Sequence, residues 1–528
     1  MSRVYDDNQT LQQKIMNGAN KLADNVASTL GPRGRNVLLK EKGKNPFITK
    51  DGVTVAHFVS LEDPFENAAA QIMKQAAIET NNEAGDGTST STILGRAILR
   101  ESQKFIASGV SPVELQRGIE AAVRDVSANL QKMARPVRST DDIAHVAAIS
   151  ANNDTSIGKL VSLAFERVGQ DGSITIEESR SMDTTLDIAE GFKLDSGYCA
   201  SAFVTDERRA VMHHEEPLFL VTDQRISAVE QILPVLEMVA REGRPLIIVA
   251  EDIEGQALAA MIMNAMRGTL KIAAIKAPHY GEERREALED LATSTGAVFI
   301  SREKGTKLKD VKMTHFGTAK FIESTKNSTI VVGGDCSAES VDEKIDSLKA
   351  LIKDAATIAE AERVQKRVVR LASGVAVISV GGSTEVEMIE KKHRIEDALE
   401  AVKAAQEQGV VAGGGTALLR ASRSICIVSQ GSGSSEMGLG ATIVAEACKE
   451  PVRQMAINSG ESPDLIIKEI LQASETDGWD FRTGELKDLV KSGIIDPVKV
   501  TRSALQNAAS CAGTLITTNF GIIQTEDK

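Results

Sequence analysis

Aromatic side chains are scarce in this chain. They make up 3% of its 528 residues, with one tryptophan and three tyrosines, whereas hydrophobic residues as a whole reach 42%. We therefore expect cores built from Ala, Val, Ile and Leu, a composition that suits helix-rich layers. The chain is also too long for one ordinary hydrophobic core, and its length predicts two or three domains.

Several patterns that mark particular classes of protein are missing. The five cysteines are scattered without a C-x-x-C pair, which disfavours a disulfide framework and a zinc site. The 74 acidic residues outnumber the 61 basic ones, and no basic block offers the phosphate contacts of a nucleic-acid binder. No apolar run approaches the roughly 18 residues of a membrane span, and the polar N-terminus lacks a signal-type segment. We expect a soluble, cytoplasmic protein that binds neither nucleic acid nor membrane.

The order of patterns along the chain predicts nested domains. Apolar residues recur at helical spacing over 9–29 and after Asp63-Pro64, short helix and strand signals alternate from about 139, and 191–373 has the pattern of an α/β domain. Helical patterns then return. This order predicts one domain interrupted by a second, which is itself interrupted by a third. Locally, Gly31 is predicted to cap the first helix and Asp51-Gly52 to form a tight hairpin turn.

The stretch NNEAGDGTSTSTILG, at 81–95, is the most informative motif. Gly85-Asp86-Gly87 is followed by hydroxyl residues and then by a helical apolar pattern. Free N–H groups at the start of a helix favour a phosphate. Asp86 would repel that phosphate unless Mg²⁺ lies between them, because Mg²⁺ typically binds one or two carboxylates together with phosphate oxygens. The stretch therefore predicts a site for a magnesium nucleotide.

Three other stretches place glycine or hydroxyl residues where an element is expected to end: TLGPRG (29–34), ITKDG (48–52) and AGGGTA (412–417). Taken singly, such short motifs are more often turns or loops than functional sites. The phosphate-binding pattern G-x-x-x-x-G-K-[ST] is absent. Spacing alone does not bring these stretches together.

Seven stretches, in order, resemble the group I (GroEL-like) chaperonins, and the match is collinear over nearly the whole chain. They are TLGPRGRNV, ITKDGVTVA, AGDGTSTSTIL, AAISANND, EVEMIEKKHRIEDAL, GVVAGGGTAL and IIDPVKVTRSALQNAAS. The resemblance implies a multidomain α+β chaperonin fold and an ATPase that folds proteins inside a ring. The implied domains are a mostly helical equatorial domain (1–132 and 409–528), a hinge-like intermediate domain (133–189 and 376–408) and an α/β apical domain (190–375).

The resemblance also implies a site for ATP and Mg²⁺, with K⁺ as a further candidate ion. Asp86 would hold Mg²⁺, and Asp397, helped by Asp51, would orient the attacking water. Two carboxylates and a metal suffice because phosphoryl transfer needs positioning and charge neutralisation more than covalent chemistry. Without the resemblance, we would interpret Asp397 as a solvent-exposed helix carboxylate beside Arg394, with no catalytic role. The other implied nucleotide-binding residues are Thr29, Leu30, Gly31, Pro32, Lys50, Gly52, Gly87, Thr88, Ser89, Thr90, Ser150, Gly413, Gly414, Ile494 and Asp496.

Apolar residues in the central segment have two readings. Most would serve as core under an α/β sheet, yet unbranched Met side chains also suit contact with varied apolar partners. By resemblance, a groove for non-native polypeptides and for the loop of a GroES-like co-chaperonin would be formed by Tyr198, Phe203, Leu233, Leu236, Leu258, Ile262 and Met263.

Some positions depart from the family pattern. Ser89 stands where the family has Thr, Asp480-Phe481-Arg482 replaces Asn-Ala-Ala near the adenine, and Ser435 and Ser462 replace Glu residues at the face between rings. These departures predict a divergent member, for which a viral genome is one candidate source. They leave open whether a seven-membered homo-oligomer forms one ring or two.

Two functions remain as hypotheses at this point. The first is an ATP-hydrolysing chaperonin, and the second is an ATP-insensitive holdase or scaffold. The presence of Asp51, Asp86 and Asp397 together favours the first, because a pure binder needs no such set. A small-molecule kinase with the same magnesium site is a weaker third, since so much of the chain would be unexplained.

Overall fold

The computed structural model describes residues 2–41, 46–168, 173–179, 181–189, 191–207, 209–303, 305–336, 338–354, 358–372, 374–423, 425 and 436–525. Ser435 lies outside this range. The chain forms two compact units: unit 1 is Met1–Leu163 with Gly382–Lys528, and unit 2 is Ala164–Gly381. Unit 2 is thus one continuous segment between the two halves of unit 1. The finer division into three domains stays a prediction.

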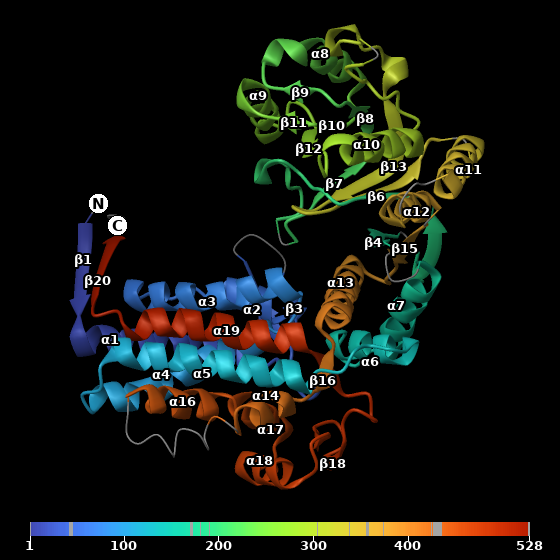
Figure 1. The fold of residues 1–528 in the computed structure, drawn as a ribbon. Helices are drawn as coiled ribbons and strands as arrows, with labels where there is room; N and C mark the ends of the chain where they lie inside the picture. Colours follow the sequence, from blue (N-terminus) through green and yellow to red (C-terminus); the bar gives the residue numbers. More distant parts are fainter. Residues whose placement is uncertain are drawn as a thin grey trace. The chain divides into compact units, whose positions relative to one another are not determined.

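Unit 1 is mostly helical, and its long helices pack side by side (Figure 1). Leu22, Met73 and Leu94 are among its fully buried side chains, so its core is aliphatic, as the composition predicted. The helices are α1 (Asn8–Ala27), α2 (Gly52–Phe58), α3 (Pro64–Ala84), α4 (Thr88–Ala107), α5 (Pro112–Met133), α6 (Thr140–Ser150), α13 (Glu385–Gln408), α14 (Thr416–Ala421), α16 (Glu436–Ala447), α17 (Glu450–Ser459), α18 (Pro463–Gln472) and α19 (Val498–Ile516). Helix α7 (Thr155–Val168) continues the chain from unit 1 into unit 2.

The described residues of unit 1 also form four antiparallel pairs of short strands. They are β1 (Ser2–Asp7) with β20 (Phe520–Thr525), β2 (Val37–Leu39) with β3 (Phe47–Thr49), β16 (Val410–Ala412) with β19 (Ile495–Pro497), and β17 (Asp477–Asp480) with β18 (Glu485–Asp488). The pair β1–β20 brings the two ends of the described chain together (Figure 1).

Two local predictions were wrong. Asp51-Gly52 is not a hairpin turn: Asp51 caps α2, because its carboxylate accepts hydrogen bonds from the N–H groups of Val53 and Thr54, each at 3.1 Å. Gly31 does not cap α1, which ends at Ala27; it lies further on, in a loop, with φ of 82°. Both stretches nevertheless end an element, which is why turn signals occur there.

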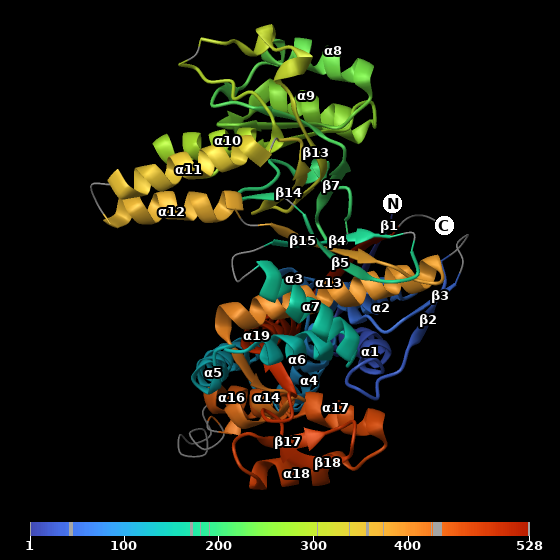
Figure 2. The ribbon, with the colours of Figure 1, turned by 90° about the vertical axis from the view of Figure 1, so that its right-hand side faces the viewer.

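Unit 2 has the predicted α/β pattern. In its described residues, a seven-stranded sheet has parallel strands β12-β10-β8 that continue into antiparallel β13, β14 and β6, and β7 pairs antiparallel with β13 off this path. A second sheet has the order β4-β15-β5. The strands are β4 (Ser173–Glu178), β5 (Thr185–Ala189), β6 (Gly191–Leu194), β7 (Met212–Glu215), β8 (Leu218–Val221), β9 (Arg225–Ile226), β10 (Leu246–Ala250), β11 (Asp252–Ile253), β12 (Ile272–Lys276), β13 (Gly317–Ser324), β14 (Thr329–Gly334) and β15 (Val375–Val380). The helices are α8 (Leu233–Glu242), α9 (Gly255–Met266), α10 (Gly281–Thr295), α11 (Ala338–Asp354) and α12 (Ile358–Ala372); α11 and α12 lie side by side in Figure 2.

A buried ion pair joins α10 to α12 in unit 2. Arg367 donates to both carboxylate oxygens of Asp290, at 2.7 and 2.8 Å, and the Asp290 side chain is fully buried. Replacing Asp290 by Asn should lower the free energy of unfolding of unit 2 by about 2 kcal/mol, because it removes the fully buried counter-ion of Arg367 and leaves only the more exposed Glu286, at 3.2 Å, as an ion-pair partner. Chemical denaturation checks this. The matched control is Asp195→Asn, which breaks the exposed pair with Arg370 at 3.0 Å and should change stability by less than about 1 kcal/mol.

Candidate functional site

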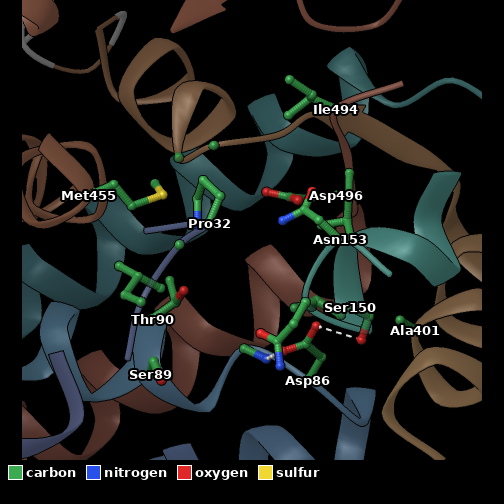
Figure 3. A pocket seen from close by; sticks show the side chains of 18 of the residues that line it. Pro32, Asp86, Ser89, Thr90, Ser150, Asn153, Ala401, Met455, Ile494 and Asp496 are labelled. Carbon is green, nitrogen blue, oxygen red and sulfur yellow. Dashed lines mark hydrogen bonds between the residues drawn. The ribbon is translucent and has the colours of Figure 1, made fainter. Parts of the chain in front are cut away.

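A cavity of about 760 Å³ lies within unit 1. The loop after α1, the starts of α2 and α4, the end of α6, one face of α13, the glycine loop before α14, and strands β17 and β19 all contribute to its wall (Figure 3). Asp51, Asp86 and Asp397 line it together. It is also lined by every other residue predicted to bind nucleotide except Gly413: Thr29, Leu30, Gly31, Pro32, Lys50, Gly52, Gly87, Thr88, Ser89, Thr90, Ser150, Gly414, Ile494 and Asp496. The structure therefore gathers stretches that spacing alone could not bring together.

The Gly85-Asp86-Gly87 turn joins α3 to α4. Both glycines have positive φ, 71° at the C-cap of α3 and 89° at the N-cap of α4, a conformation that favours glycine. A β-carbon at Gly87 would lie 2.8 Å from the Val500 side chain. Helix α4 begins at Thr88, earlier than the sequence pattern indicated, so Thr88, Ser89 and Thr90 form its first turn. Backbone N–H groups without partners in the helix are thus directed toward the cavity.

Asp86 is held at the floor of this cavity. Its carboxylate accepts hydrogen bonds from the Gly87 N–H at 2.5 Å and from the Ser150 hydroxyl at 3.1 Å, the latter drawn in Figure 3. Burial, together with the nearby charge of Asp51, raises the pKa of Asp86. A buried carboxylate of this kind is stabilised by a cation.

A magnesium ion shared with a phosphate fits this donor set. Among the described residues, no group of three or more His, Cys, Asp or Glu side chains could hold a metal without other ligands. Mg²⁺ commonly binds one or two carboxylates and takes its remaining ligands from phosphate and water. Asp86 beside the first turn of α4 supplies the protein part of such a site.

Asp51 and Lys50 are positioned by their neighbours. The Asp51 carboxylate also accepts the Thr54 hydroxyl at 2.5 Å, which adds to its two bonds at the start of α2. A β-carbon at Gly52 would lie 2.4 Å from the Ser89 hydroxyl oxygen, so only glycine lets α2 approach α4 this closely. Lys50 Nζ donates to the Gly31 carbonyl at 3.0 Å, and burial lowers its pKa. The start of α2 is therefore fixed against the phosphate end of the cavity.

The far end of the cavity is formed by β17, β19 and the glycine loop. Asp496 on β19 lies beside Gly413, where a β-carbon would come within 2.9 Å of its carboxylate oxygen. Gly413 therefore packs behind Asp496 instead of lining the cavity. Pro32 and Met455 add apolar surface at this end (Figure 3).

Burial and the neighbouring Asp86 raise the pKa of Asp496 to about 7. Because this folded-state pKa lies above the roughly 3.9 of an unfolded Asp, the group favours the folded state at low pH, and this contribution is lost as pH rises from about 4 to 7. Asp496→Asn should therefore stabilise the nucleotide-free protein relative to the parent, by on the order of 2 kcal/mol more at pH 8 than at pH 5. Denaturation curves at the two pH values measure this, and an equal gain at both would contradict it.

Sequence reasoning missed the segment after α6. Asn152 and Asn153 line the cavity and have positive φ, 59° and 63°. Such values are uncommon outside glycine but several-fold enriched in Asn, so an Asn-Asn pair after a helix was a usable signal. His145 on α6 also lines the cavity. Nearby, Arg394 pairs with Asp154 at 3.2 Å.

In unit 2, the residues predicted to form a polypeptide-binding groove have unequal exposure. Leu233 and Met263 are 45% and 48% exposed, whereas Tyr198, Leu258 and Ile262 are half-buried against the core. Phe203 and Leu236 are 2% and 6% exposed. These two pack in the core, Leu236 on the inner face of α8, so the structure does not present them at the surface.

Comparison with known proteins identifies the family. The model of the TCP-1/cpn60 chaperonin family matches residues 22–526. The fold is similar to two crystal structures of the chaperonin gp146 from the bacteriophage EL 2 (Pseudomonas aeruginosa), both in the presence of ATP-BeFx. Crystal form II is 23% identical, with a TM-score of 0.67 over 99% of this chain and 100% of that one; form I is 22% identical, with 0.64 over 99% of each.

At these identities the structural likeness establishes the fold, and the predicted chaperonin fold is confirmed. No helix in the described part of the chain is long and apolar enough to span a membrane. The family model covers nearly the whole chain, including every stretch that lines the cavity. The chain therefore belongs to the TCP-1/cpn60 chaperonin family.

Proposed function

We propose that this chain is the subunit of an ATP-dependent chaperonin, which binds Mg–ATP in the cavity of unit 1, hydrolyses it, and promotes folding of non-native polypeptides in a ring-shaped chamber. One observation carries the proposal: Asp51, Asp86 and Asp397 line the same cavity as the first turn of α4. An ATP-insensitive holdase, which only binds the apolar surfaces of its clients, would not need three carboxylates beside a phosphate-binding helix start.

In this proposal, different residues of the cavity would have different roles in phosphoryl transfer. The N–H groups and hydroxyls of Thr88, Ser89 and Thr90 would bind phosphate oxygens. Bound Mg²⁺, held by Asp86, would neutralise phosphate charge. Asp397 would orient the attacking water and accept its proton, with Asp51 assisting, since positioning and charge neutralisation account for most catalysis of this reaction. Lys50, also in the cavity wall, would add positive charge near the phosphates.

The other end of the cavity would take the nucleoside. Asp496 suits the ribose hydroxyls as an acceptor, and Leu30, Gly31, Pro32, Gly414 and Ile494 offer close backbone and apolar contact. Ser150 would keep Asp86 in place through its hydrogen bond. Thr29, whose hydroxyl lies 3.2 Å from that of Ser89, would support the phosphate cradle.

Unit 2 would supply the surface for non-native chains. Leu233 on α8 and Met263 on α9 expose apolar area, and Met adapts its shape to varied partners. The ring, of seven subunits in one or two layers, and a GroES-like co-chaperonin are further parts of the proposal that rest on family membership.

Refolding of a chemically denatured enzyme by the full-length protein tests this function. We expect recovery of the enzyme's activity with Mg–ATP but not with ADP, together with steady release of phosphate. Native mass spectrometry with and without ATP should detect a ring. A protein that prevents aggregation equally well without nucleotide, and releases no phosphate, would instead be an ATP-insensitive holdase.

A further inference from the structure

Arg420, at the end of α14, directs its guanidinium group at backbone carbonyls. One terminal nitrogen donates to the carbonyl oxygens of Ile470 and Asp477, each at 2.8 Å, and also to that of Ser474. Among the described residues, no carboxylate lies within ion-pair distance of it, and burial lowers the pKa of Arg420. The guanidinium group is therefore held mainly by backbone carbonyls.

The three carbonyls belong to one stretch, 470–477, in which the Asp477 N–H also donates to the Ser474 carbonyl at 3.1 Å. Ile470 lies in the last turn of α18, at the negative end of the helix dipole, and its carbonyl also accepts the Ala473 N–H at 3.3 Å. Ser474 lies in the following loop, and Asp477 is the first residue of β17. Figure 2 shows β17 and α18 below α14. One side chain therefore fastens α14, α18 and the start of β17 together.

Strand β17 leads directly into the cavity wall. Trp479 and Phe481 line the cavity, and Phe481 packs with Leu419 and Met455. The Trp479 indole N–H donates to Glu461 at 2.6 Å, which holds the strand from its other side. A β-carbon at Gly414 would lie 3.6 Å from the Trp479 carbonyl oxygen. The glycine loop and β17 are thus in contact, and Arg420 holds the first residue of the same strand, Asp477.

We propose that Arg420 is a positioning residue for the base of the bound nucleotide. By holding α18 and β17 against α14, it fixes the strand segment that brings Trp479 and Phe481 to the cavity wall, where aromatic side chains suit contact with a purine. It does not touch the phosphates or the reacting atoms. Lysine would not reproduce these contacts, because its side chain is shorter and lacks the second terminal nitrogen, which in Arg420 donates to the Ala473 carbonyl at 3.5 Å. This proposal rests on the proposed nucleotide-binding function.

The test compares a ligand that has a base with one that lacks it. Full-length Arg420→Met and Arg420→Lys are titrated with Mg–ATP and with Mg–tripolyphosphate by calorimetry, and the fluorescence of Trp479, the single tryptophan of the chain, is followed in parallel. We expect both variants to bind ATP at least ten-fold more weakly and tripolyphosphate within two-fold of the parent, with a shifted Trp479 emission. Arg423→Met is the matched control: Arg423, three residues on, makes one 3.3 Å bond to the Leu471 carbonyl, and should behave as the parent.

Any other outcome contradicts the proposal. If a folded variant binds ATP with the parental affinity, Arg420 does not position the base. An equal loss for both ligands means that Arg420 only supports the general stability of unit 1. If Arg420→Met fails to fold, Arg420→Lys, which keeps the charge, decides between these results. A parent protein that binds neither ligand refutes the proposed function itself, and this result is distinct from any effect of Arg420.

Discussion

Replacing Asp397 by Ala should reduce the rate of ATP hydrolysis at least about 100-fold while the dissociation constant for Mg–ATP changes less than about three-fold. The reason is that Asp397 lines the cavity from α13, whereas the phosphate cradle is formed by the start of α4. Loss of a group that positions or deprotonates the nucleophile typically costs 10²–10⁴ in rate. Steady-state phosphate release and equilibrium nucleotide titration measure the two effects separately.

Glu407→Ala provides the control on the same helix. Glu407 forms a surface ion pair with Lys499 at 2.7 Å and does not line the cavity, so its loss should leave both hydrolysis and binding unchanged. An Asp397→Ala protein that hydrolyses ATP at the parental rate would show that another group orients the water. A protein that loses binding as well would show that Asp397 mainly supports the cavity.

Replacing Asp86 by Asn should weaken Mg–ATP binding at least about 100-fold and make the remaining binding insensitive to Mg²⁺. Asn has nearly the same shape, and its side-chain oxygen can still accept the Gly87 N–H, but its neutral oxygen is a poor ligand for Mg²⁺. The nucleotide-free variant should also be more stable than the parent at neutral pH, because burial raises the pKa of Asp86 and the ionised form is disfavoured in the fold.

The combination of weaker binding and higher stability distinguishes this prediction from damage to the fold. Titrations with ATP in the presence of Mg²⁺ and of a chelator, together with melting curves of the nucleotide-free protein, test both parts. Ser150→Ala, which removes one hydrogen bond to Asp86, should have a much smaller effect on affinity. Parental affinity in Asp86→Asn would place the metal elsewhere.

Several elements could be predicted from local sequence because local energetics decide them. Asp63 and Pro64 start α3 as an N-cap and first helical residue, and Leu11, Ile15, Leu22 and Val26 of α1 are buried, as their spacing predicted. The Asp51-Gly52 prediction failed for a physical reason. Such a pair suits a hairpin and a helix start equally well, and the packing of Gly52 on Ser89 selects the helix.

The sequence by itself determined the aliphatic cores, the order of helical and α/β segments, and the chemistry of each glycine-rich stretch, since these depend on residue type and short-range periodicity. Only the tertiary structure decided which stretches meet. Asp86 and Ser150 are 64 positions apart and hydrogen-bonded, and Arg420 reaches carbonyls 50–57 positions away. The burial that raises the pKa of Asp496 and hides Phe203 depends likewise on packing between distant segments, which no local pattern records.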